Sequence, residues 1–486
     1  MPRIASFSRF VIFIGAIGCA GNDASVASPA GPTNPTPVPA AAPTITVTAA
    51  PAATTSEPFA RFSFTASEGA RTECRVDDAD WVACSSPHVV MPRTGTDLPL
   101  GVGTHHFQVR AMAASGATSA AVTREWNVVS VFTAPMPALA RTTQTPARAD
   151  AGGWLGIFRI NCEFAHAAYD DPIIYPNRAG AAHLHNFYGY KTVSAATTAE
   201  SLFVTGSSSC QGDNLNRSSY WVPTLLAPSA TDPSGWQVVQ ALAGADSVAH
   251  ELFYYSVAVG DPRSVRPYPV GLRMIAGTAA TMPGTPQSSS VARWHCLSWQ
   301  SSDGANPRWS PSIPECTIPD QVRFDLFFPS CWNGRDLDSP DHKSHMAYPV
   351  NVTGRNSASC PVTHPVPVPR VSYHYSFPVL PSNADRASRS SRRWRLASDN
   401  FTVGGNVAGG WSLHGDWFNG WHPEVLQALI TNCLHAGLDC HDGNLANGWR
   451  LGGVSKGSGT LPGIVNAGMG GTASLHAGMH GALGSP

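Results

Sequence analysis

Two histidines two residues apart, His183 and His185, are the first feature of this 486-residue chain whose spacing suggests chemistry. Side chains two positions apart on a strand project from one face, so both imidazoles could bind the same ion. A third histidine, His414, is followed by Gly415, which permits close backbone approach. Imidazole ligands suit zinc or copper, with hydrolytic chemistry for zinc and oxidative chemistry for copper. A histidine pair lining the edge of a core is the simpler alternative.

The segment 331–349 is unusually rich in Asp, His, Lys and Arg for a chain in which charged residues make up only 13%. Within it, His345 is the fourth predicted metal ligand. The acid–base candidates are Asp341, His342 and Asp416; a carboxylate here would act as a general base or orient an imidazole. Asp338 and Asp341 form a metal-free alternative, a carboxylate pair of the glycosidase kind. Asp and Pro also favour turns, which would explain much of this composition without a site.

Aromatic and basic residues near these clusters are predicted to bind the substrate. The candidates are Trp332, Arg335, Lys343, Trp417 and Trp421. Tryptophan rings provide stacking faces for sugars, and the two basic side chains could bind acidic or hydroxyl groups. Burial in a core is the alternative for the tryptophans. We expect the four histidines His183, His185, His345 and His414 to converge in one cleft beside this aromatic wall.

The N-terminal residues indicate export. An apolar run at residues 10–17 follows two arginines and is too short to cross a bilayer as a helix. Residues 16–19 resemble the bacterial lipobox, although Ala16 replaces the usual Leu. Residues 1–19 are therefore predicted to be a lipoprotein-type signal peptide with Cys19 as the lipidated residue. We expect an exported, membrane-anchored lipoprotein at the bacterial cell surface or in the periplasm; secretion with cleavage nearby is the alternative.

The chain has 11 cysteines, ten apart from Cys19. An even number without Cys-x-x-Cys spacing favours disulfides over a zinc–thiolate site. The two pairs predicted from spacing are Cys74 with Cys84 and Cys433 with Cys440. The six other cysteines, whose fifteen connectivities stay open, are Cys162, Cys210, Cys296, Cys316, Cys331 and Cys360.

Composition and short alternating runs predict a mainly β protein. With 45 Gly and 41 Pro, long charged helices are not expected. The runs indicate a small immunoglobulin-like sandwich followed by a larger β-sandwich-type domain with few helices. A strand is expected at residues 201–204 and a helix beginning at Pro423. The predicted segments are a disordered tether at 20–43, the immunoglobulin-like domain at 44–129, a linker at 130–150, the large domain with the site at 151–445, and a Gly-rich tail at 446–486.

Residues 42–129 resemble an immunoglobulin-like repeat of bacterial surface proteins. The matching segments are Glu73-Cys74-Arg75-Val76-Asp77, Trp81, Cys84-Ser85-Ser86-Pro87 and Gly103-Thr104-His105-His106-Phe107-Gln108-Val109-Arg110-Ala111. The resemblance implies a spacer or adhesion module without chemistry of its own.

The large domain resembles a family of unknown function found in secreted bacterial proteins and in fungal surface proteins, where it often accompanies WSC carbohydrate-binding domains. The motifs are Asp171-Pro172-Ile173 with His183-x-His185, Cys331-Trp332-Asn333-Gly334 through Asp338-Ser339-Pro340-Asp341-His342-x-Ser344-His345, Cys360-Pro361 with His364-Pro365-Val366, and His414-Gly415-Asp416 with Asn419-Gly420-Trp421. Asn333 stands where many members have Asp. The resemblance implies a surface setting and supplies no reaction.

Two classes of function fit these observations. The leading hypothesis is an extracytoplasmic metal-dependent enzyme acting on a polysaccharide. The alternative is a non-catalytic glycan-binding or structural cell-surface lipoprotein, favoured by the lack of a phosphate-loop or His-Glu-x-x-His motif. The expected partners are a polysaccharide or cell-wall glycan and, through the lipid anchor, the membrane. A net charge of -1 and a pI near 7.0 argue against nucleic acid.

Overall fold

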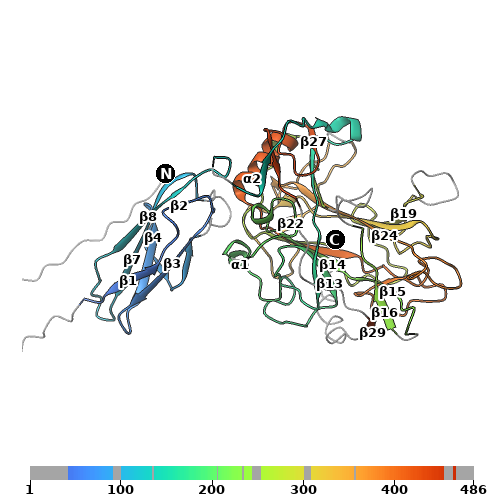
Figure 1. The fold of residues 1–486 in the computed structure, drawn as a ribbon, viewed down its shortest axis with the longest axis horizontal. Helices are drawn as coiled ribbons and strands as arrows, with labels where there is room; N and C mark the ends of the chain where they lie inside the picture. The colour runs from blue at the N-terminus through green and yellow to red at the C-terminus, as the bar shows by residue number, and fades with distance from the viewer. Residues whose placement is uncertain are drawn as a thin grey trace, which may run out of the picture.

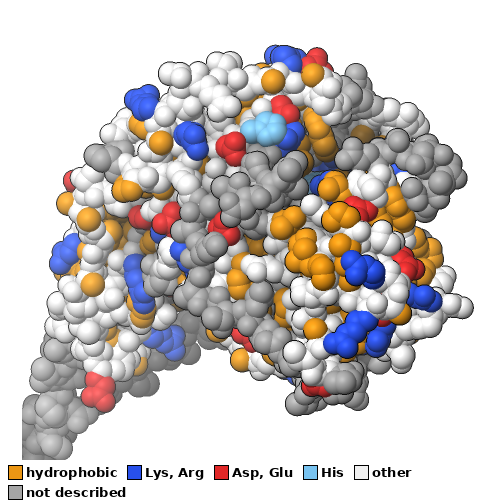
Figure 2. All heavy atoms as spheres, turned by 45° about the vertical axis from the view of Figure 1, so that its right-hand side comes forward, with side chains coloured by type: hydrophobic (Ala, Val, Ile, Leu, Met, Phe, Trp, Pro, Cys, Tyr) orange, Lys and Arg blue, Asp and Glu red, His pale blue; other side chains and the backbone are white. Residues whose placement is uncertain are grey.

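The computed structural model describes residues 42–90, 100–133, 136–204, 206–232, 235–242, 253–299, 308–354, 357–453 and 464–466. The predicted signal peptide with Cys19, nearly all of the tether and most of the tail lie outside these residues. Strands far outnumber helices in the described part, which confirms the predicted mainly β class. No helix there is long and apolar enough to cross a membrane. On the face in Figure 2, charged side chains are scattered over a largely uncharged surface.

The N-terminal unit is a small sandwich of two sheets (Figure 1). One sheet has the order β1 (Ile45–Ala49), β3 (Ala60–Ala66), β6 (His88–Val90). The other has the order β2 (Thr54–Thr55), β8 (Val122–Val128), β7 (Gly103–Met112), β4 (Arg71–Val76), β5 (Val82–Cys84). Alternating apolar residues of both sheets enclose one core, where Phe62 stacks on Phe107 at 4.0 Å and contacts Trp126 edge-on.

Two larger sheets form the framework of the second unit. The seven-stranded sheet has the order β10 (Ala147–Arg148), β27 (Leu438–Cys440), β11 (Ile157–Ile160), β17 (Phe253–Ser256), β24 (Arg370–Pro378), β20 (Gln321–Phe327), β19 (Ala292–Cys296). The five-stranded sheet has the order β12 (Phe164–Ala168), β13 (His185–Gly189), β14 (Ser219–Pro223), β26 (His414–Phe418), β18 (Arg273–Gly277).

These two sheets pack face to face through an aromatic core. The rings of Tyr220 and Phe253 lie 4.0 Å apart, and the hydroxyls of Tyr220 and Tyr255 are 2.6 Å apart. The sheets approach closely at Gly415, where a Cβ atom would lie 2.7 Å from Leu326. Strand alternation therefore gives each sheet one inner face and one outer face. We call the outer face of the five-stranded sheet the site face and that of the seven-stranded sheet the arginine face.

Smaller elements surround this sandwich. Three further sheets have the orders β25 (Arg395–Leu396), β15 (Leu225–Pro228), β16 (Gly235–Val238), β29 (Ile464–Asn466); β22 (Met346–Ala347), β21 (Cys331–Trp332), β23 (Val366–Pro367); and β28 (Trp449–Leu451), β9 (Leu139–Arg141). The helices are α1 (Ala199–Val204) and α2 (Pro423–Leu429), which continues as a π-turn over Ile430–Leu434. Short 3-10 turns occupy Ala149–Gly152, Asp213–Leu215 and Pro262–Ser264. The helix predicted to begin at Pro423 is confirmed.

Residues 201–204 were expected to form a strand and instead belong to α1. The side-chain hydroxyl of Thr198 accepts a hydrogen bond from the backbone N–H of Ser201, and the Ser201 hydroxyl accepts one from the N–H of Thr198. This reciprocal pair caps the start of the helix. The capping residues precede an apolar run too short to show a helical period, so the pattern was ambiguous.

Residues 130–150, expected to be a linker, pack into the larger unit. Val131 is fully buried in its core, and the N–H of Val131 and hydroxyl of Ser130 donate to the Glu424 carboxylate. β9 pairs with β28 and β10 with β27, so the start of the predicted tail also belongs to the fold. Small residues and prolines occur both in linkers and in short edge strands, so local composition does not distinguish the two. Pairing with distant strands determines which one forms.

Side-chain contacts join the two units. His422, at the start of α2, lies with its Nε2 3.0 Å from the carbonyl oxygen of Ser56. Phe59 meets Phe203 of α1 edge-on, with ring centroids 6.3 Å apart. The loop between β2 and β3 therefore docks the N-terminal sandwich against the two helices of the larger unit.

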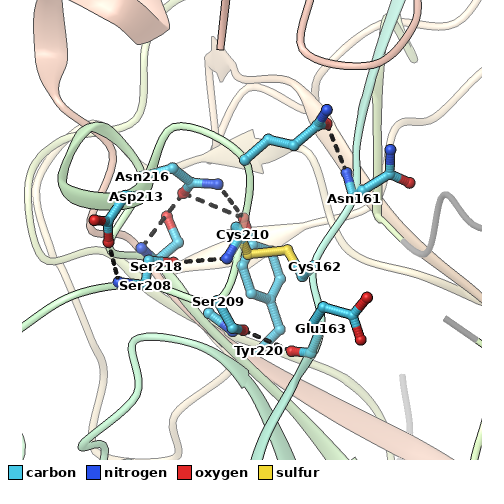
Figure 3. The surroundings of a disulfide bond; sticks show 12 residues. Asn161, Cys162, Glu163, Ser208, Ser209, Cys210, Asp213, Asn216, Ser218 and Tyr220 are labelled. Atoms are coloured by element: carbon cyan, nitrogen blue, oxygen red, sulfur yellow. Dashed lines mark hydrogen bonds between the residues drawn. A yellow bond between two sulfur atoms is a disulfide. The ribbon is translucent and has the colours of Figure 1, made fainter. Parts of the chain in front are cut away.

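Disulfides join all ten cysteines of the described residues. The predicted pairs Cys74–Cys84 and Cys433–Cys440 are both formed. The open connectivities resolve as Cys162–Cys210, Cys296–Cys316 and Cys331–Cys360. Around Cys162–Cys210, hydrogen bonds hold both segments together: the N–H of Asn161 donates to the Gln211 side chain and the Ser209 hydroxyl to the carbonyl of Glu163 (Figure 3). These bonds satisfy the backbone N–H of Asn161 and the hydroxyl of Ser209 beside the bridge.

Candidate metal site

The site face brings together three of the four predicted histidines. His185 is the first residue of β13 and His414 the first of β26, and both strands pair with β14 between them. His183 lies two residues before His185. One ring nitrogen from each of the three histidines lies within 4.8 Å of the others. Zinc binds imidazole nitrogens at about 2.0–2.1 Å, so small side-chain shifts would let the three share one ion.

Backbone carbonyls orient two of these imidazoles. The Nδ1 of His185 lies 3.0 Å from the carbonyl oxygen of Asp170, and the Nδ1 of His414 lies 2.8 Å from that of Ser412. A carbonyl only accepts, so in each ring Nδ1 carries the proton and Nε2 carries the lone pair. Donation of the second ring N–H to a carbonyl is the usual support for a metal-binding histidine.

Two buried carboxylates adjoin the histidines. Asp416 follows His414 by two residues on β26, and with Asp171 and His185 it forms a second group whose ligand atoms lie within 4.8 Å. Asp171 Oδ1 accepts the backbone N–H groups of the two residues at 173 and 174. Asp416 Oδ2 is buried and has no hydrogen-bond partner among the described residues. Such an oxygen is costly unless a proton or a cation compensates it.

Burial raises the pKa of both Asp171 and Asp416. The nearby charge of Asp171 raises the pKa of Asp416 further, and Lys343 partly offsets this. Burial also lowers the pKa of Lys343, whose ammonium donates to the carbonyl of Gly277 at 2.7 Å. When both carboxylates are ionised they outnumber the one ammonium, and a divalent cation would neutralise this surplus and favour the ionised forms.

A cavity of about 30 Å³ opens between these groups. Its lining consists of Asp171, Ile174, Tyr175, Ala182, His183, Ile275, Thr278, Ala279, Lys343, His414 and Asp416. The volume suits an ion with a few water molecules and falls about tenfold below the roughly 300 Å³ of the smallest common organic-ligand pockets. A sugar ring therefore does not fit inside it.

His345, the fourth predicted ligand, lies outside this cluster. One of its ring nitrogens is 2.7 Å from the carbonyl oxygen of Arg273, and the other is 2.9 Å from the Ser339 hydroxyl. The turn before His345 holds it in this position. Asp341 Oδ1 stabilises that turn by accepting hydrogen bonds from the hydroxyls of Ser339 and Ser344. The structure thus corrects the expected four-histidine convergence to three.

Asp341 and His342, both acid–base candidates, have structural partners here. Burial raises the pKa of Asp341, but hydrogen bonds from Ser339 and Ser344 lower it more, so the carboxylate is a poor base. His342 Nδ1 is 3.0 Å from both oxygens of Asp338, and this hydrogen bond raises the pKa of His342. Since Asp338 and Asp341 are each occupied by such contacts, the metal-free carboxylate pair has no support.

The three tryptophans predicted to stack on sugars are buried. Trp417 and Trp421 have no exposed surface, and Trp332 is 4% exposed. The indole N–H of Trp421 donates to the Tyr255 hydroxyl, and that of Trp332 to a backbone carbonyl. Strand alternation explains Trp417, since its neighbour Asp416 projects outward and Trp417 must project into the core. The expected aromatic wall is therefore part of the interior.

The two basic substrate-binding candidates have different positions. Lys343 lines the cavity, whereas the Arg335 side chain is 81% exposed and pairs with Asp336 away from the lining residues. Sequence reasoning gave no role to Asp171 or Tyr175, which also line the cavity. The available signal was the position of Asp171 in a segment that resembles a motif of the family of unknown function.

Comparison with known families places the site inside a recognised domain. The family described as Domain of unknown function (DUF1996) matches residues 171–421, which include every residue of the cavity lining. No curated protein matches the chain. The family match covers about half of the chain.

Proposed function

The chain belongs to the DUF1996 family, and from this premise we propose that it is an extracytoplasmic metal-dependent enzyme that acts on a polysaccharide. One observation carries the proposal: His183, His185 and His414 present ligand atoms to a common point beside the unpartnered Oδ2 of Asp416. Three imidazoles with an adjacent open position are the arrangement of catalytic rather than structural zinc sites.

The residues of the site divide into three roles. His183, His185 and His414 would hold the ion, and an all-imidazole set favours zinc or copper. Bound there, either metal would supply Lewis acidity, and copper would add redox chemistry. Asp416 is placed to accept a proton, because burial keeps its pKa above the ordinary range for a carboxyl group. Lys343 would bind a negatively charged or hydroxyl group that enters the cavity.

The substrate would meet the site from its edge. The cavity admits no sugar ring, but His183, Ile174 and Lys343 in its lining are partly exposed. A polymer lying across this edge could present one bond or hydroxyl group to the ion. The burial of the three tryptophans leaves this site without the aromatic platform that a purely glycan-binding function would need here.

The extracytoplasmic setting is supported by the disulfides. Five bridges in one chain are typical of proteins from an oxidising compartment. Anchoring through a lipid on Cys19 is a separate proposal, because that residue lies outside the described part of the chain. Mass spectrometry of detergent-extracted protein should find a diacylated N-terminal Cys19; a mature chain starting after Cys19 would reject the anchor.

Calorimetry with the metals alone tests the central proposal. Chelator-treated protein should bind one equivalent of zinc or copper, and His183→Ala with His185→Ala should abolish this binding. His106→Ala is the matched control, since this histidine is half exposed in the N-terminal sandwich. Absence of binding by the wild type, or equal binding by the double variant, would reject the metal site.

A further inference from the structure

The arginine face carries an arginine on four of its strands. They are Arg159 of β11, Arg293 of β19, Arg323 of β20 and Arg370 of β24. Their strand neighbours, such as Phe324 and Val371, are buried in the core between the two sheets, so the arginines project from the opposite side. This face has no role in the proposed metal site.

Carboxylates neutralise two of these arginines. Arg159 lies 2.8 Å from Asp439, and the Nε of Arg293 lies 2.8 Å from Asp325 Oδ2. The other oxygen of Asp325 is 2.8 Å from the Nδ1 of His374. Each oxygen of Asp325 therefore already accepts one hydrogen bond, and Asp325 makes no hydrogen bond or ion pair with Arg370.

Arg370 has no such partner. Its side chain forms no hydrogen bond or ion pair with any residue that the structure describes, and its Nε is buried. Its guanidinium lies 5.1 Å from the ring centre of Phe327 and 5.9 Å from that of Trp154. The guanidinium of Arg293 is 5.0 Å from the same Phe327 ring. Arg293 and Arg370 thus lie near the same Phe327 ring, and only Arg293 is paired with a carboxylate.

This arrangement is unfavourable for the protein alone. Burial and, to a smaller extent, the nearby charge of Arg293 lower the pKa of Arg370 to about 10. A largely buried cation without a counter-charge or acceptor reduces stability. Arg323 also has a buried Nε without an acceptor. An anion with several oxygens would satisfy the unused donors of both Arg293 and Arg370.

We propose that Arg370 and Arg293 bind the oxyanion of an acidic polysaccharide, a carboxylate or a sulfate. The planar fork of a guanidinium matches either group. The polymer is indicated by Trp309, a partly exposed ring that packs on the Arg293 guanidinium at 3.5 Å, so a sugar bound by Arg293 would lie beside an aromatic side chain. The choice of a polysaccharide rests on the proposed function; binding of the oxyanion does not. Lying on the face opposite to the metal site, this site would hold the polymer rather than transform it.

Binding of defined polymers to the full mature chain tests this proposal. The probes are polygalacturonate, which carries carboxylates, dextran sulfate, which carries sulfates, and dextran, which is neutral. Affinity for at least one acidic probe should exceed that for dextran, and Arg370→Met should weaken that acidic binding at least tenfold. Whichever acidic probe binds identifies the oxyanion. Arg335→Met is the control, because Arg335 is exposed and paired with Asp336.

Two further measurements separate a binding role from a structural one. Zinc binding by Arg370→Met should equal that of the wild type, so failure of the metal proposal and failure of this one are distinguishable. The thermal midpoint of Arg370→Met without ligand should stay level or rise, since an uncompensated charge is removed. Arg370→Lys, which keeps the charge without the fork, should retain partial binding. Equal affinity of the wild type for acidic and neutral probes, or equal losses in Arg370→Met and Arg335→Met, would overturn the proposal.

Discussion

The two outer faces of the large sandwich follow the same strand alternation and end with opposite charge surpluses. On the site face, Asp171 and Asp416 are buried beside one ammonium group, that of Lys343. On the arginine face, Arg370 is left over after Asp325 has been shared between Arg293 and His374. Each face thus holds a charge that the described residues do not balance. A buried charge surplus thus indicates the sign of the ligand that would compensate it, a cation on one face and an anion on the other.

The largest expected effect concerns the interior that both faces share. Trp417→Ala removes a fully buried indole from the strand that carries Asp416 and should lower the free energy of unfolding by about 3–5 kcal/mol. Denaturant titration measures the loss. Trp309→Ala, at a partly exposed position on the arginine face, should cost well under half as much. Equal losses would show that Trp417 is not a core residue.

The next effect tests the acid–base role on the site face. Asp416→Asn keeps the size of the side chain and removes the proton acceptor, so turnover of the polysaccharide should fall by about 100-fold or more. One equivalent of metal should still bind through the three imidazoles. Product release measured at saturating metal gives the rate, and Asp341→Asn, in the neighbouring turn, serves as control. Similar activity in Asp416→Asn and the wild type would remove Asp416 from the mechanism.

A third prediction uses the pH dependence of the arginine face. Burial raises the pKa of Asp325, but His374 and Arg293 lower it more, so the net pKa lies below the ordinary value. The carboxylate therefore stabilises the fold above the unfolded pKa of about 3.9, and this contribution is lost as pH falls below it. Asp325→Asn should cost about 2 kcal/mol near pH 7.

The difference between Asp325→Asn and the wild type should shrink progressively below about pH 4. Thermal unfolding across that range provides the measurement, with Asp336→Asn in an exposed ion pair as control. A difference that stays constant with pH would show that the carboxylate charge is not what stabilises this face.

The smallest effect tests the sign of the surplus on the site face. Lys343→Met removes the one ammonium group that lines the cavity and should strengthen zinc binding by about fivefold, because a nearby positive charge opposes the ion. Arg335→Met, away from the cavity, should leave the affinity unchanged. Weaker binding by Lys343→Met in calorimetry would mean that Lys343 supports the site in another way.

Strand alternation carries most of what could be predicted of the site. It placed His183 and His185 together, and it brought His414 and Asp416 to one face. The same rule, applied to β26, sends Trp417 to the opposite side, so the expectation of an aromatic wall beside Asp416 conflicted with the pattern that predicted the histidines. The sandwich class and both local disulfides likewise followed from short-range patterns.

The remaining features depend on long-range contacts that one sequence does not reveal. His345 is held by a carbonyl of β18, and Val131 is buried by a unit most of which comes later in the chain. The surplus on Arg370 is visible only when the strand register has assigned Asp325 to Arg293 and His374. Pairing between distant segments determines these positions, and local secondary-structure propensity does not predict them.

The most direct test of the central claim is the location of the ion itself. Crystals soaked in zinc or copper, with anomalous data collected at each absorption edge, would place the metal without reference to activity. We predict one peak at about 2.0–2.1 Å from a ring nitrogen of each of His183, His185 and His414, next to Asp416. A peak elsewhere with these three histidines unoccupied, or no peak at saturating metal, would contradict the account.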